Sequence, residues 1–145
     1  MKLQSVLRVV AGIVCVHSVV VGVCLNGPPS VVAGLAAMFL DYHSALEPST
    51  LLAARMLGAY MTFFGLAMGL VAWDPVRHRA LLTLAALLLV ARAGQRLAHL
   101  DELRAVFGIS DAKNWAYVAT MLVMAAACVF FRIWLMKNSA SKKRA

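Results

Sequence analysis

Charged residues are scarce in this chain of 145 residues, because only 14% are Asp, Glu, Lys or Arg while 63% are hydrophobic. A soluble domain of this size cannot cover so much apolar surface with so little charge. Intrinsic disorder is excluded as well, since it requires low hydrophobicity and high charge. Acidic residues are fewest, six against fourteen basic ones, but the basic residues lie beside apolar runs, which argues against nucleic acid as a partner. The mean hydropathy of +0.83 favours a membrane protein.

The chain also has little of what metal sites and hydrolytic centres need. Its three cysteines, Cys15, Cys24 and Cys128, form no C-x-x-C pair and no cluster with histidine, so neither a zinc site nor a disulfide framework is predicted. No paired membrane carboxylates, Ser/His/Asp set or glycine-rich phosphate loop is present. We therefore predict no metal site, no catalytic residues and no hydrolase activity.

Four apolar runs are long enough to cross a bilayer, for which about 20 residues in a helix are needed. They cover residues of about 6–25, 51–73, 79–98 and 115–136. None of the segments between them alternates as a membrane strand does, so helices are the way to satisfy the backbone in lipid. The sequence predicts an all-α integral membrane four-helix bundle, with one domain over residues 1–136 and a basic cytoplasmic tail over 137–145.

Boundary residues support these limits. The hydroxyls of Ser49 and Thr50, after Pro48, are expected to cap the second span, and Ser110 and Asp111 the fourth. The pair at positions 74–75, Asp-Pro, is expected to end the second span. Only residues 76–78 then join the second and third spans, which predicts an antiparallel hairpin.

The distribution of Lys and Arg predicts the orientation. One side of the membrane receives nine basic residues: Lys2, Arg8, Arg77, Arg79, Arg132, Lys137, Lys142, Lys143 and Arg144. The other side receives five: Arg55, Arg92, Arg96, Arg104 and Lys113. Five of the six acidic residues also lie on that second side. We expect the basic side, with both termini, to be cytoplasmic.

Small residues recur at helical spacing in the first two spans, which is typical of faces where membrane helices approach closely. The two stripes are Ala11, Cys15, Ser18 and Gly22, and Gly58, Thr62, Gly65 and Gly69. They are predicted to pack helices within one chain, with a homodimer seam as the alternative. His17 is expected to face the bundle interior in a hydrogen-bonded packing role, and a ligand or proton-relay role is the alternative.

The two outward loops are long and partly apolar, so each is predicted to hold a short interfacial helix, one within 27–50 and one within 101–108. Beneath these helices, four polar residues share one face at the outer end of the third span, and Arg55 enters the second span at a similar depth. The four are Arg92, Gln95, Arg96 and His99.

Arginines in the outer leaflet run against the positive-inside bias and need compensation. The available carboxylates are Asp41, Glu47, Asp101 and Glu102. One interpretation is a set of salt ties between arginine and carboxylate that fix the short helices to the bundle. The other is a pocket that binds an anionic or carbonyl-bearing ligand, such as a lipid headgroup or a quinone.

Residues 6–12, VLRVVAG, and residues 54–60, ARMLGAY, followed by Gly65, resemble the DoxX-like family of small bacterial membrane proteins. The resemblance implies a four-helix bundle in the bacterial inner membrane, attached in some members to quinone-linked sulfur or thiol oxidation. Arg55 matches an R-x-x-G pattern of that group.

The sequence thus favours an accessory or assembly subunit that binds other membrane proteins and the lipid bilayer, without catalytic activity of its own. The alternative is a quinone-linked redox subunit of the DoxX type, for which quinone is a possible cofactor.

Overall fold

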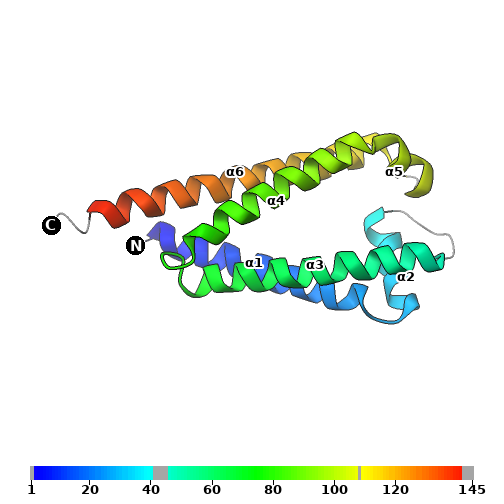
Figure 1. Ribbon diagram of the computed structural model, residues 1–145, viewed down its shortest axis with the longest axis horizontal. Helices are drawn as coiled ribbons and strands as arrows, with labels where there is room; N and C mark the ends of the chain where they lie inside the picture. Colours follow the sequence, from blue (N-terminus) through cyan, green and yellow to red (C-terminus); the bar gives the residue numbers. More distant parts are fainter. Residues whose placement is uncertain (1, 41–45, 108, 142–145) are drawn as a thin grey trace.

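The computed structural model describes residues 2–40, 46–107 and 109–141, and its fold is all-α. Six helices follow one another: α1 Lys2–Leu25, α2 Pro29–Leu40, α3 Pro48–Trp73, α4 Arg79–Ala98, α5 Leu100–Phe107 and α6 Asp111–Ser141. Four of them, α1, α3, α4 and α6, are long and apolar enough to cross a membrane. The predicted four-span architecture with short helices in two connections is confirmed (Figure 1).

The helices are longer than the apolar runs at three of the four spans. α4 begins and ends at the predicted residues, but α3 begins at Pro48, and α6 extends from Asp111 to Ser141. The additional turns consist mainly of polar residues, so a search for apolar runs does not include them. Pro48 lies in the first turn of α3, where proline is tolerated because no intrahelical donor is lost.

Two of the three boundary predictions are confirmed. Asp74 ends α3, and its Oδ1 accepts hydrogen bonds from the backbone N–H of Val76 and Arg77, each at 3.1 Å. At the start of α6, the Ser110 hydroxyl accepts the N–H of Lys113 at 3.4 Å. The expectation for the second span is wrong, because the N-cap of α3 is Glu47, without a side-chain capping bond, and Ser49 and Thr50 lie inside the helix.

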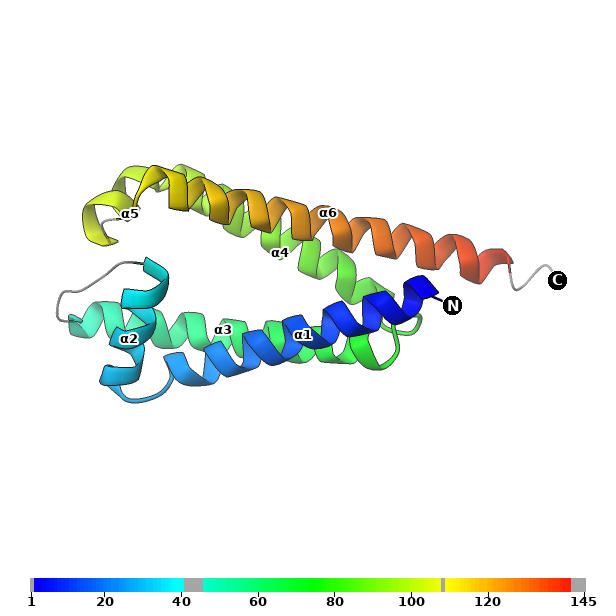
Figure 2. The same ribbon diagram turned by 180° about the vertical axis from the view of Figure 1, so that it is seen from behind.

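The long helices form two antiparallel pairs, α1 with α3 and α4 with α6. The pairs lie close together at the end where α1 begins and α6 ends, which we call the base, and separate towards the end that carries α2 and α5 (Figures 1 and 2). Each pair is contiguous in sequence, and the loop after α3 joins the two at the base.

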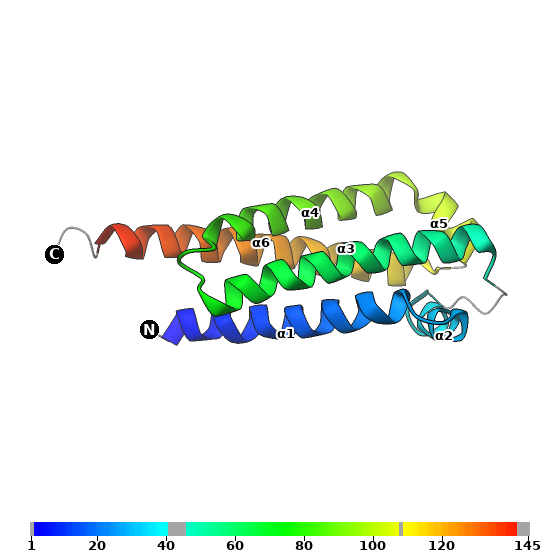
Figure 3. The same cartoon turned by 60° about the horizontal axis from the view of Figure 1, so that its bottom comes forward.

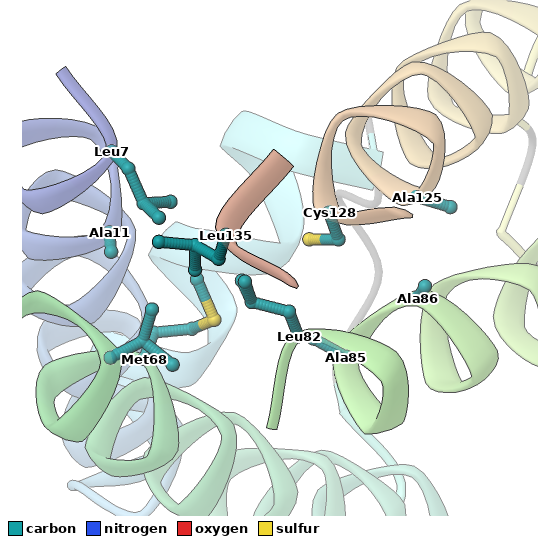
Figure 4. Close-up of a cluster of buried hydrophobic side chains, with 10 residues drawn as sticks. Leu7, Ala11, Met68, Leu82, Ala85, Ala86, Ala125, Cys128 and Leu135 are labelled. Atoms are coloured by element: carbon teal, nitrogen blue, oxygen red, sulfur yellow. The ribbon is translucent and has the colours of Figure 1, made fainter. Parts of the chain in front are cut away.

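All four long helices contribute to one buried cluster at the base (Figure 4). Leu7 and Leu82 are 2% and 1% exposed, and Ala11, Ala85 and Ala125 are buried in the same cluster. Small side chains permit close approach where lipid supplies no hydrophobic drive between helices. The base is therefore the firmly packed half of the molecule.

The small-residue stripes of α1 and α3 face each other along the α1–α3 pair. A Cβ atom added to Gly22 would lie 2.6 Å from the carbonyl oxygen of Gly58, and one added to Gly65 would lie 2.9 Å from the carbonyl oxygen of Cys15. Ser18, in the same seam, is 3% exposed. The two stripes thus pack against each other within one chain.

His17 does not lie in that seam. Its side chain is exposed on the surface of α1, between the exposed Val16 and the buried Ser18. The prediction that His17 faces the interior of the bundle is wrong, because successive helical residues are rotated by about 100° and the α1–α3 seam takes Cys15, Ser18 and Gly22.

α2 runs across the end of the α1–α3 pair rather than along it, so it is seen end-on in Figure 3. Pro29 stands in its first turn, and Val32, 1% exposed, anchors it to the bundle. The far end of α2 reaches α6, where the Tyr117 hydroxyl donates to the backbone carbonyl of Phe39 at 2.7 Å. α2 therefore bridges the two helix pairs at the end where they separate.

Candidate functional site

The candidate polar residues occupy the α2–α5 end, but they do not converge on one pocket. The last turns of α4 carry Arg92, Gln95 and Arg96, and His99 is the C-cap of this helix. Arg92 and Arg96 are one turn apart, yet Arg92 turns to α3 and Arg96 to α6. Asp41 lies outside the described residues.

Arg96 forms a polar cluster with two residues of α6. Its Nε donates to Oδ1 of Asn114 at 2.9 Å, and its guanidinium carbon lies 4.7 Å from the centre of the Tyr117 ring. Through its hydroxyl, Tyr117 also holds α2. We call Arg96, Asn114 and Tyr117 the α4–α6 polar cluster.

Two donors of this cluster lack a partner among the described residues. They are Nη2 of Arg96 and Nδ2 of Asn114, both buried, and Asn114 as a whole is only 1% exposed. The amide orientation follows from chemistry: guanidinium has donors only, so the Asn114 oxygen must face Arg96 and its NH₂ group must point elsewhere. Both open positions are therefore donors, and their chemical complement is an acceptor oxygen.

Arg92 has a different environment. Its guanidinium carbon lies 5.4 Å from the centre of the Tyr60 ring on α3, an arrangement in which the ring face attracts the cation. Below Tyr60 the facing sides of α3 and α4 enclose an apolar groove, whose lining includes Phe64 and Leu88.

The remaining members of the predicted set are exposed. Arg55 lies on the surface of α3, and Gln95 on that of α4. His99 Nδ1 lies 3.0 Å from the Glu102 carboxylate, and both side chains are more than half exposed. These three residues add no donor or acceptor to the α4–α6 polar cluster in the described structure.

The arginine–carboxylate ion pairs that the structure describes at this end are those of Arg104, not of Arg55, Arg92 or Arg96. Arg104 contacts Asp111 and, at 3.7 Å, Asp101, and the hydrogen bond that the Arg104 guanidinium donates to the Asp111 carboxylate raises the pKa of Arg104. Glu47 is the exposed N-cap of α3. Within residues 2–40, 46–107 and 109–141, no carboxylate lies within ion-pair distance of Arg55, Arg92 or Arg96.

Sequence reasoning missed the aromatic and amide partners of the arginines. Tyr60 and Tyr117 do not stand out in their apolar runs, and Asn114, just before the last run, is 18 residues from Arg96. A signal was present, because Asn114 and Tyr117 are spaced by three and share one helix face near the start of the last span. To predict that this face contacts Arg96, one would also need to know the register in which α4 and α6 pack as an antiparallel pair.

The hydroxyl of Tyr117 supports a first prediction. We expect Tyr117→Phe to keep the ring beside Arg96, to lower the free energy of unfolding by about 1 kcal/mol and to loosen α2, because it removes the bond to Phe39. Hydrogen exchange of the α2 amides in nanodiscs measures this. Tyr60→Phe, on α3, is the control, and equal exchange in both variants would contradict the bridging role of Tyr117.

No three histidine, cysteine or acidic side chains gather in the described part of the chain. Comparisons with protein-family models, with curated proteins and with solved structures find no match for this chain. The class of the protein is therefore assigned from its four helices that are long and apolar enough to cross a membrane: it is a small multi-pass integral membrane protein.

Proposed function

We propose that the protein is an accessory or assembly subunit that binds another integral membrane protein through the outward face of α1. The observation that carries this proposal is His17. Its imidazole is exposed about two thirds of the way along a membrane helix, surrounded by exposed apolar side chains such as Val16 and Val20, each more than half exposed. A polar side chain is costly in lipid and favours a partner that offers it a hydrogen bond.

Co-purification tests this role. The full-length protein, isolated from its native membrane in mild detergent, should bring a larger membrane protein in fixed stoichiometry. We expect His17→Leu to reduce that recovery at least fivefold while leaving helix content unchanged, since His17 does not pack in the α1–α3 seam. Val20→Leu, on the same exposed face, is the matched control. Undiminished recovery with His17→Leu would contradict the use of this face.

The proposed location is the bacterial inner membrane, with both termini cytoplasmic, and it rests on the excess of Lys and Arg at the base. Reporter fusions at Ala45, His78, Ser110 and Ala145 should report outside, inside, outside and inside. The opposite alternation would reverse the orientation, and a loss of alternation would contradict the four-span topology.

A second candidate is a quinone-linked redox subunit of the DoxX type. The observation that favours it is the α4–α6 polar cluster, whose two open donors suit a carbonyl oxygen. Purified protein should then carry a quinone, and Arg96→Gln should release it. Protein without quinone, isolated from quinone-rich membranes, would argue against this role.

A further inference from the structure

The loop that joins α3 to α4 at the base borders a small hollow. Five residues line it: Leu70, Trp73, Asp74, Arg77 and His78. Its volume is about 300 Å³, at the lower end of the range of about 300–1,000 Å³ for ligand pockets. Asp74 is already engaged, because its Oδ1 accepts two backbone N–H groups of the loop. We call this feature the α3–α4 loop hollow.

The length of α4 places the hollow at a membrane surface. α4 runs from Arg79 to Ala98, 20 residues or about 30 Å, which equals the thickness of the hydrocarbon core of a bilayer. Arg79 therefore lies near the surface at the base, and the two residues before it, Arg77 and His78, lie at headgroup level. Trp73, the last residue of α3, lies at the same surface, where aromatic side chains are favoured.

The arginines of this loop have no carboxylate partner in the described structure. Arg77 and Arg79 are exposed, and no acidic side chain of the described ranges lies within ion-pair distance of either. A guanidinium group has donors only, and it binds a phosphate through two of them at once. The loop therefore favours an anion that has several acceptor oxygens.

Beside the hollow, the surface of α3 towards the middle of the membrane is apolar. Phe63, Ala67 and Leu70 are spaced by four and three residues, so they share one face of the helix. Leu70 borders the hollow, whereas Phe63 and Ala67 line the apolar groove between α3 and α4. The hollow and the groove thus follow one another along a single face of α3.

The depth of the groove matches the chain region of the leaflet at the base. On α4 its lining extends from Leu81 to Leu88, two and nine residues beyond Arg79, or about 3 and 14 Å at 1.5 Å per residue. One leaflet of the hydrocarbon core is about 15 Å deep. A lipid whose headgroup occupies the hollow therefore has an apolar path for one chain, past Leu70 and into the groove.

We propose that the α3–α4 loop hollow binds the headgroup of an anionic phospholipid from the leaflet at the base, with the phosphate on Arg77. One acyl chain lies along Leu70 and the groove, and the exposed Trp73 ring flanks the lipid at the interface. The proposal requires only that the protein spans the membrane. It is independent of the roles proposed for the outward face of α1 and for the α4–α6 polar cluster.

Nanodiscs that contain phosphatidylglycerol and phosphatidylcholine in equal amounts provide the test. Native mass spectrometry after release of the full-length protein counts the phospholipids that stay bound. We expect phosphatidylglycerol to be retained preferentially, and Arg77→Gln to reduce that preference about fivefold, which is the effect of one cation near a membrane surface. Arg8→Gln is the matched control and should leave the preference unchanged, because Arg8 is an exposed arginine of α1 near the base that does not line the hollow.

A second pair of variants tests the wall of the hollow. Trp73 is 81% exposed, so Trp73→Ala removes part of the wall without opening the bundle and should lower the retention of phosphatidylglycerol. Trp115→Ala removes an exposed indole near the opposite surface and should leave retention unchanged. Glycerol phosphate, which has the headgroup chemistry without a chain, should not compete. Helix content and elution volume establish that each variant is folded.

Four outcomes would overturn the proposal. Equal retention of the two phospholipids by the unaltered protein would show that anionic lipid is not preferred. An equal loss of preference in Arg8→Gln and Arg77→Gln would show that the charge of the whole base, rather than the hollow, attracts the lipid. Equal retention by Trp73→Ala and Trp115→Ala would exclude the wall, and displacement by glycerol phosphate would show a site for free phosphate esters.

Discussion

Gly22→Ala is expected to lower the free energy of unfolding by about 1–3 kcal/mol, the range found for overpacked interiors. The new Cβ would lie 2.6 Å from the carbonyl oxygen of Gly58 and 2.7 Å from the backbone nitrogen of Thr62. Both atoms belong to the backbone of α3, so no side chain can move aside, and α1 and α3 must separate. Thermal unfolding in detergent, followed by circular dichroism, measures the loss.

Gly12→Ala is the matched control, because it makes the same change in the same helix. A Cβ at Gly12 would meet nothing within 4 Å. Alanine is the better helix former by about 0.5–1 kcal/mol, so Gly12→Ala should be neutral or slightly stabilising. Equal stability of the two variants would contradict the close contact of α1 and α3.

Asn114→Leu is expected to cost about 2–3 kcal/mol, because it leaves Nε of Arg96 without its acceptor as well as Nη2. The double variant Arg96→Met with Asn114→Leu removes both polar groups and fills the site with apolar side chains. It should be more stable than Asn114→Leu alone, since a buried charge without a partner costs more than a missing pair.

Chemical denaturation of the two single variants and the double variant measures this coupling. Additive losses would show that Arg96 and Asn114 do not depend on each other. A matched change elsewhere on α6, such as Thr120→Leu at an exposed position, should have a small effect.

Much of the fold could be predicted because lipid imposes simple demands on a sequence. The limits of α4 follow from Asp74 and Pro75, which end α3, and from the polar residues after Ala98. The predicted start of the second span is three residues later than the start of α3, because Pro48, in the first turn of the helix, looks like a boundary residue.

The error at His17 has a different cause. Polar residues of membrane helices usually face the bundle interior, but in α1 the stripe containing Cys15 and Ser18 determines which face is buried. His17 precedes Ser18 by one residue and so lies about 100° from it around the helix. The stripe was the stronger signal.

The candidate site could be predicted only in part. The arginines stand out in the sequence because they are charged in apolar helices, whereas their partners were assigned by charge alone. The structure gives Arg92 and Arg96 aromatic rings and an amide instead. Such contacts depend on the register between helices, in which α4 meets α3 on one side and α6 on the other, and a single sequence does not specify that register.

The division into two sequence-contiguous pairs has a consequence for how the protein is made. The α1–α3 hairpin is complete before the ribosome reaches α4, so the first half can insert and close its glycine seam while the second is still being synthesised. Final assembly is then the lateral docking of two finished hairpins at the base. A polypeptide cut within residues 74–78 should accordingly reassemble when its two fragments are produced together in one membrane.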